Sequence, residues 1–133
     1  MEIRIEHLNQ MKFAASIRGH RVVCGPPASD GSADEGPTPP EFLLFSLGSC
    51  AGYYAASYLK NHGIDSALSV CVHAEKLPAP ARLGGFRVEI EAPGLPPEHE
   101  TGLMRTVNAC LIKNTILHSS EIETVLVPAL VCA

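Results

Sequence analysis

Apolar and polar residues alternate along the first part of the chain, which is the pattern of half-buried β-strands. Residues 2–8 (EIRIEHL) alternate in this way, and residues 11–17 and 20–24 predict two further strands joined by a tight Arg-Gly turn. Residues 25–40 follow, consisting mostly of Gly, Pro, Ser and Asp, and they predict an irregular loop. A loop of this length inside a compact domain is usually functional or mobile.

A long helix is predicted to begin directly after this loop. Thr38 is a favourable N-cap, Pro39 stands at the first helical position and Glu41 follows the cap by three residues, so the sequence TPPE predicts a capping box. Residues 61–63 (NHG) supply the stop signal. Together these signals predict a helix of about 23 residues, roughly 34 Å long.

The residues from Phe42 to Leu59 carry no charged side chain, and a run of this length is compatible with a membrane span. Serines, tyrosines and glycines within the run, and amphipathic strands on either side of it, favour instead a helix that is buried on nearly all sides. We therefore expect no membrane association. Because so short a chain has too little material to surround this helix, the pattern favours a homodimer whose second subunit helps to cover it.

The second half of the chain predicts a hairpin, a second helix and a final strand. Alternating apolar residues mark strands within 68–74 and 86–90, and residues 121–132 predict an edge strand interrupted by Pro128. This order of elements predicts an α+β fold, a single domain over residues 1–133 with its helices packed on an antiparallel sheet. The second helix begins after a Pro-Pro pair, and its predicted apolar face consists of Leu103, Val107, Cys110 and Leu111.

Composition excludes several classes of function. The formal net charge is −4 and no Lys or Arg cluster is present, so a nucleic-acid partner is not expected. The first eight residues (MEIRIEHL) include acids and lack the apolar core of a secretory signal, which favours a cytoplasmic protein. The 5 cysteines are widely spread without a CxxC pair, and the 6 histidines show no metal-ligand spacing. We expect free thiols, no metal and no cofactor.

Two of the cysteines are candidates for chemistry. Cys50 lies in the middle of the long helix between Gly48 and Gly52, whose small size would let a second element approach closely. Cys110 belongs to the apolar face of the second helix. Either thiol is equally explained as core packing. Two cysteines on the inward faces of two helices can nevertheless meet, and redox chemistry requires such a pair. The remaining cysteines are expected to be structural: Cys24, Cys71 and Cys132.

Two segments resemble the motifs of the OsmC-like protein family. Residues 36–50 (GPTPPEFLLFSLGSC) resemble its first cysteine motif, in which cap, glutamate and cysteine keep a fixed spacing. Residues 107–117 (VNACLIKNTIL) resemble its second, and the similarity covers nearly the whole chain. The resemblance implies an intertwined homodimer that exchanges strands and packs its long, buried, cysteine-bearing central helices back to back. The characterised branches of the family are thiol peroxidases that reduce organic hydroperoxides.

The resemblance also implies roles for individual residues. Cys50 would be the peroxidatic thiol, which attacks the peroxide and becomes a sulfenic acid, and Cys110 would condense with it to a disulfide. A dithiol reductant would then reopen the bridge. In the peroxidase branches an arginine paired with a glutamate activates the first cysteine. The candidates here are Arg18 and Arg21 for the arginine and Glu41 for the glutamate.

The chain departs from the peroxidase pattern at one position. Where the hydroperoxide-reducing branches carry the glutamate, this chain has Pro40, and Glu41 comes one residue later. Since one residue turns a helix by about 100°, Glu41 need not face the arginine, and its capping role accounts for it fully. Three hypotheses therefore stay open: an organic hydroperoxide peroxidase, a non-catalytic dimer that binds a small apolar ligand in its interfacial cleft, and a thiol redox sensor.

Overall fold

The computed structural model describes residues 1–28, 33–118 and 120–130. These form two compact units, one made of Met1–Phe42 with the described residues after Glu121, and the other of Leu43–Glu121. Helix α1 (Pro39–Asn61) begins in the first unit and continues in the second. The prediction of a single domain over residues 1–133 stays a prediction.

The first unit contains a three-stranded antiparallel sheet in the order β1-β2-β3, formed by β1 (Ile5–His7), β2 (Phe13–Ile17) and β3 (His20–Cys24). Two of the strands are shorter than predicted, but all three lie where the alternation places them. The Arg-Gly turn is confirmed: Arg18 has φ 49° and Gly19 has φ 82°. Two consecutive positive φ values are those of the tight hairpin turn whose twist matches that of its strands.

The predicted closing strand at 121–132 is wrong for the residues that the structure describes there. Residues 120–130 contain no strand, and residues 131 and 132 lie outside the described part of the chain. A strand requires a neighbouring strand for its hydrogen bonds, and Pro128 can donate none. Apolar side chains along this segment are exposed, among them Ile122 at 89% and Leu126 at 101%.

Helix α1 spans 23 residues, with the bounds that its end signals predict. The capping box is confirmed: the Thr38 N–H donates to Glu41 Oε2 at 2.7 Å, and the Glu41 N–H donates to Thr38 Oγ1 at 3.4 Å. At the other end Gly63 adopts φ 62°, the left-handed conformation that commonly ends a helix.

The second unit is built on a long hairpin of β4 (Ser69–Pro78) and β5 (Ala81–Glu91). The turn at Ala79-Pro80 lies within the predicted region, although both strands reach closer to it than the alternation indicates. Val70 pairs with Ile90 and Val72 with Val88, and these half-buried residues lie on the face that the helices cover. The residues between them point to the opposite face and are exposed.

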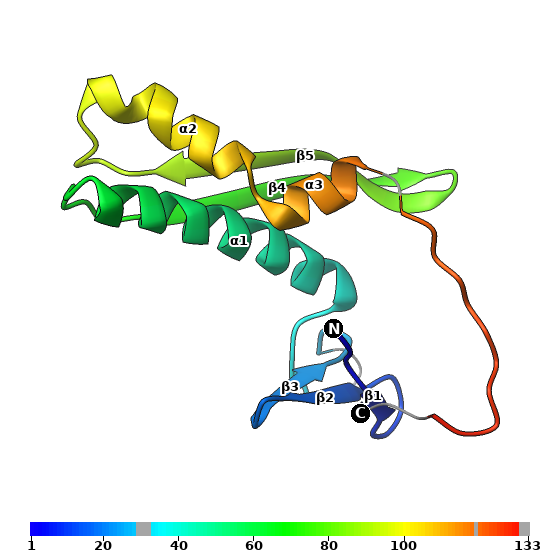
Figure 1. Cartoon of the computed structure of the whole chain (residues 1–133). Coiled ribbons are helices and arrows are strands. Elements are labelled where there is room, and N and C mark those ends of the chain that lie inside the picture. The colour runs from blue at the N-terminus through cyan, green and yellow to red at the C-terminus, as the bar shows by residue number, and fades with distance from the viewer. Residues whose placement is uncertain (29–32, 119, 131–133) are drawn as a thin grey trace. The chain divides into compact units, whose positions relative to one another are not determined.

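Helices α1 and α2 (Glu100–Asn108) both pack on the hairpin. Figure 1 shows them running along β4 and β5, with the short helix α3 (Leu111–Leu117) following α2. A 3-10 turn, η1 (Pro97–His99), leads into α2. The core consists of Ala51, Ala55, Tyr58, Leu103 and Val107, with Val88 and Ile90 packed against it.

The second helix differs from the prediction in one respect that matters for the site. A single helix with Cys110 and Leu111 on its apolar face was expected, but α2 ends at Asn108 and Cys110 is the N-cap of α3. The apolar periodicity runs across this break, because α2 buries Leu103 and Val107 and the Cys110 side chain is buried as well. The pattern therefore gives no sign of it.

Helix α1 buries one face within the chain. Leu47, Ala51 and Ala55 are buried, whereas Phe45 is 70% and Tyr53 80% exposed. The all-round burial that the sequence predicts is therefore not observed in a single chain. By length and a mean hydropathy of 1.2 the helix could also cross a membrane, a test that the core helices of many proteins pass.

The close approach predicted at the two glycines of α1 is confirmed, and β4 is the element that approaches. A Cβ atom added at Gly48 would lie 2.7 Å from Val72 Cγ2, and one added at Gly52 would lie 3.3 Å from Val70 Cγ2. The first distance is too short for any side chain to fit without movement. The helix segment that carries Cys50 is thus held tightly against the hairpin.

Candidate active site

The structure brings Cys50 and Cys110 together. Cys110 is buried, with 1% of its surface exposed, and Cys50 on α1 is half-buried; both are free thiols. Burial raises the pKa of the Cys110 thiol, and the neighbouring Cys50 raises it further through a side-chain hydrogen bond and through its charge. The two thiols are therefore neighbours, as a pair that exchanges between dithiol and disulfide must be.

The position of Cys110 is fixed by the junction between α2 and α3. As the N-cap of α3 it has φ −51° and ψ 122°, and its Sγ accepts a hydrogen bond from the Lys113 N–H at 3.5 Å. Its carbonyl oxygen accepts from the Asn114 N–H at 3.0 Å, which is the first bond of the helix. The N–H groups of Ile112 and Lys113 lower the pKa of Cys110, but burial and Cys50 outweigh them.

A cavity of about 220 Å³ lies against Cys110. Its walls are mostly apolar and come from α1, β5, α2 and α3, a composition that suits an apolar organic molecule. Among the described residues that line it, Lys113 is the only charged one, and its Nζ donates a hydrogen bond to Asn108 Oδ1. The apolar lining residues are Leu47, Ala51, Phe86, Val88, Ile90, Met104, Val107, Ile116 and Leu117.

Sequence reasoning missed Lys113 and Asn108 as site residues. Both belong to the second cysteine motif: Asn108 lies two residues before Cys110, and Lys113 lies three residues after it. On a continuous helix Asn108 would face away from the cysteine, so only the break between α2 and α3 reveals that both line the same cavity.

Glu41, Arg18 and Arg21 belong to the first unit, whereas both cysteines belong to the second. Glu41 bonds to Thr38, and the Thr38 N–H followed by its hydroxyl lowers the pKa of that carboxyl. Arg18 lies in the hairpin turn and Arg21 on β3 opposite Ser16, and both are exposed. The predicted arginine–glutamate activation of Cys50 stays a prediction.

The remaining cysteines differ from one another. Cys24 is half-buried at the end of β3, in keeping with a structural role. Cys71 is exposed on β4, so core packing does not account for it. Cys132 lies outside the described residues.

Comparisons with known proteins agree with this fold. A sequence profile described as OsmC-like protein matches residues 31–125, and a search of curated proteins gave no match. A Psychrobacter arcticus protein described as an osmotic stress and detoxification response protein is similar in structure at 16% identity, with a TM-score of 0.74 over 85% of both chains.

Two further solved structures are similar. The OsmC-like protein of Mycoplasma pneumoniae is 18% identical, with a TM-score of 0.67 over 87% of this chain and 86% of that one. The organic hydroperoxide resistance protein OhrB of Bacillus subtilis is 16% identical, with a TM-score of 0.54 over 86% of this chain and 90% of that one. At these identities the likeness shows a shared mixed α+β fold.

Proposed function

The chain belongs to the OsmC-like protein family, and from that premise we propose that it is a thiol peroxidase that reduces organic hydroperoxides with Cys50 and Cys110. The observation that carries this proposal is a pair of neighbouring thiols of which one, Cys110, lines an apolar cavity. Structural similarity to an organic hydroperoxide resistance protein supports a role in oxidative-stress defence. The cytoplasm is the matching compartment, because its reductants keep thiols reduced.

The reaction starts at Cys50. Its thiolate attacks one peroxide oxygen, the O–O bond breaks, and the alkoxide takes up a proton and leaves as an alcohol, so that Cys50 becomes a sulfenic acid. The Cys110 sulfur then attacks the Cys50 sulfur, which forms the disulfide and releases water. A dithiol reductant exchanges with the bridge, becomes oxidised itself and restores both thiols.

The raised pKa of Cys110 supports this order of events. A neutral Cys110 thiol donates a hydrogen bond and therefore stabilises a thiolate on Cys50 rather than competing with it for the negative charge. Cys110 then serves as the second nucleophile once Cys50 has been oxidised. The pair thus divides the two roles between a half-buried and a fully buried thiol.

Lys113 is the cation that we place beside this pair. It lines the cavity with Cys110, and Asn108 holds its ammonium group. A positive charge near a thiol pair favours the thiolate that peroxide reduction needs. The surrounding apolar walls favour an alkyl or aryl hydroperoxide over hydrogen peroxide, since an apolar group gains from leaving water there.

A homodimer completes the proposal. Phe45 and Tyr53 expose large apolar surfaces on α1, and Ile122, Val125 and Leu126 expose more in the segment that forms no strand. A second copy of the chain would cover Phe45 and Tyr53 with its own α1. It would also pair with the segment around Ile122 and Leu126, which would then form an exchanged strand. Such an arrangement would also explain why the sequence pattern of α1 predicts burial on nearly all sides.

Turnover of cumene hydroperoxide with excess dithiothreitol tests the function. We expect catalytic consumption of the peroxide by the wild type, complete loss in Cys50→Ser, and an unchanged rate in Cys24→Ser. Hydrogen peroxide should be consumed more slowly. A protein that forms the disulfide once but does not turn over would be a redox sensor, and one that ignores peroxide would leave ligand binding as the remaining hypothesis.

A further inference from the structure

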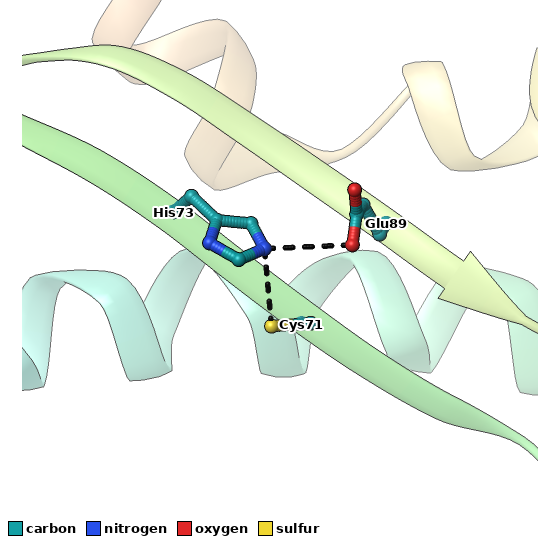
Figure 2. Close-up of side chains that lie close together, drawn as sticks. All are labelled: Cys71, His73 and Glu89. Atoms are coloured by element: carbon teal, nitrogen blue, oxygen red, sulfur yellow. Dashed lines mark hydrogen bonds and ion pairs between the residues drawn. The ribbon is translucent and has the colours of Figure 1, made fainter.

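Three potential metal ligands meet on the exposed face of the β4–β5 hairpin, away from the cysteine pair. Cys71 pairs with Glu89 across the two strands, and His73 follows Cys71 by two residues, which returns it to the same face. His73 Nε2 lies 3.3 Å from Cys71 Sγ and 3.4 Å from Glu89 Oε2, and all three donor atoms lie within 4.8 Å of one another. Figure 2 shows the three side chains converging above the strands.

The hydrogen bonds within the cluster do not satisfy all three groups. Both contacts of His73 are made by the same ring nitrogen, Nε2. A neutral Nε2 carries either a proton or a lone pair, so it serves one neighbour at a time. The same geometry excludes a catalytic relay, in which the two ring nitrogens would face the thiol and the carboxylate separately. A cation between the three donor atoms would satisfy all of them.

The distances and donor types suit a zinc ion. Zinc holds sulfur at about 2.3 Å and nitrogen or oxygen at about 2.0–2.2 Å, which in a tetrahedron separates neighbouring donor atoms by roughly 3.3–3.6 Å. The two contacts of His73 already have this spacing. Closing the remaining separation between Cys71 and Glu89 requires only side-chain rotation, because these residues lie directly opposite each other.

One carboxylate oxygen of Glu89 faces the cluster, and the cluster is open to solvent. Glu89 bonds to Arg87 Nε through Oε1 at 2.7 Å, which leaves Oε2 for the cluster. The side chains of His73 and Glu89 are 56% and 47% exposed, so an ion from solution can reach them.

We propose that Cys71, His73 and Glu89 form a binding site for a zinc ion, with water as the fourth ligand. Binding converts the Cys71 thiol into a zinc-bound thiolate and releases its proton to solvent. The thiolate and imidazole select zinc and similar soft or borderline metals over Mg²⁺ and Ca²⁺, which prefer oxygen ligands. The site uses neither Cys50 nor Cys110 and is independent of the proposed peroxidase.

Titration of the reduced full-length protein with Co²⁺, followed by displacement with Zn²⁺, tests the site. We expect one equivalent of Co²⁺ with a thiolate-to-cobalt charge-transfer band, lost when Zn²⁺ is added. Cys71→Ser should abolish the band. His73→Asn and Glu89→Gln should each weaken Zn²⁺ binding by at least about tenfold, since even outer-shell changes cost that much.

Matched controls separate this site from other thiols and carboxylates. Glu91→Gln changes a carboxylate on the same face of β5 that bonds instead to Ser69, and Cys24→Ser removes a thiol of another strand. Both should bind Co²⁺ as the wild type does, and so should the Cys50→Ser/Cys110→Ser double variant. A band that survives Cys71→Ser, one that disappears with the double variant, or the absence of saturable Zn²⁺ binding would overturn the proposal. Far-UV circular dichroism without metal checks that each variant is folded.

Discussion

The Cys110 thiol has a raised pKa because it is buried and because Cys50 lies beside it. In the proposed reaction Cys110 carries the proton of the pair, and its contact with Cys50 joins helix α1 to the junction of α2 and α3. In the proposed reaction this proton first stabilises the Cys50 thiolate and must then be lost before the disulfide can form. The raised pKa thus affects the two steps in opposite ways.

The rate of disulfide formation after Cys50 oxidation should rise with pH. Below the pKa of Cys110, each unit of pH increases its thiolate about tenfold, so the step should accelerate by up to about a hundredfold between about pH 7 and about pH 9. Trapping the sulfenic acid with dimedone at successive times measures the step directly. A rate that does not change over this range would show that loss of the Cys110 proton does not limit it.

Replacing Lys113 by Met should slow the reaction of Cys50 with cumene hydroperoxide by about threefold to tenfold, because it removes the positive charge that we place beside the thiol pair. Lys113→Arg keeps the charge and should restore most of the rate. Lys60→Met removes a lysine from the last turn of α1 and serves as the control, with no change expected. Equal rates in Lys113→Met and the wild type would remove Lys113 from the site.

The two glycines of α1 should respond differently to substitution by alanine. Both changes gain about 1 kcal/mol of helix propensity. At Gly48 the new methyl group lies 2.7 Å from Val72 Cγ2, and such overpacking costs about 1–3 kcal/mol, whereas the 3.3 Å contact at Gly52 is milder. Thermal unfolding should therefore give Gly48→Ala a lower Tm than Gly52→Ala. The reverse order would contradict the tight packing of α1 on β4.

The capping box at the start of α1 should make the free energy of unfolding depend on pH in the acidic range. Because Thr38 lowers the pKa of Glu41 in the folded state, its contribution is present above the unfolded pKa and is lost as pH falls through the folded pKa. Glu41→Gln should remove this part of the pH dependence in urea unfolding. Thr38→Ala should lower the free energy of unfolding by about 0.5–2 kcal/mol at neutral pH. An unchanged pH profile in Glu41→Gln would mean that the box does not contribute to stability.

The proposed homodimer depends on the exposed side of α1. Light scattering should find the wild type as a dimer, and Tyr53→Glu should raise its dissociation constant by at least about tenfold, since a charge replaces a large apolar contact. Lys60→Glu is the control for added negative charge on the same helix and should stay dimeric. A monomeric wild type would leave the exposed apolar residues of α1 without this explanation.

The sequence predicts best those elements whose signals come from residues close together in the chain. Both ends of α1 follow from neighbours in the chain, Thr38 with Glu41 at one end and Gly63 at the other, and both are confirmed. The strands of the hairpins are likewise given by alternation. The closing edge strand at 121–132 is also a prediction of the sequence, but a strand needs a partner that the described part of the chain does not supply.

The candidate site shows the same division. The sequence predicts that Cys50 and Cys110 can meet, because it places both on the inward faces of helices, and the two thiols do interact. The helix break at Cys110 could not, since its burial continues the apolar period of α2. The pairing of Cys71 with Glu89 depends on the register between β4 and β5, and the spacing of residues along the sequence does not predict that register.

The most direct test of the proposed peroxidase is intact mass and peptide mapping of the reduced protein after brief exposure to stoichiometric cumene hydroperoxide, with hydrogen peroxide in parallel. We expect rapid loss of about 2 Da, mapped to a Cys50–Cys110 bridge and faster with the organic peroxide. Cys110→Ser should instead gain about 16 Da at Cys50. An unchanged mass, or slow oxidation spread over all the cysteines, would contradict a peroxidase and leave the two thiols as core packing beside a ligand cavity.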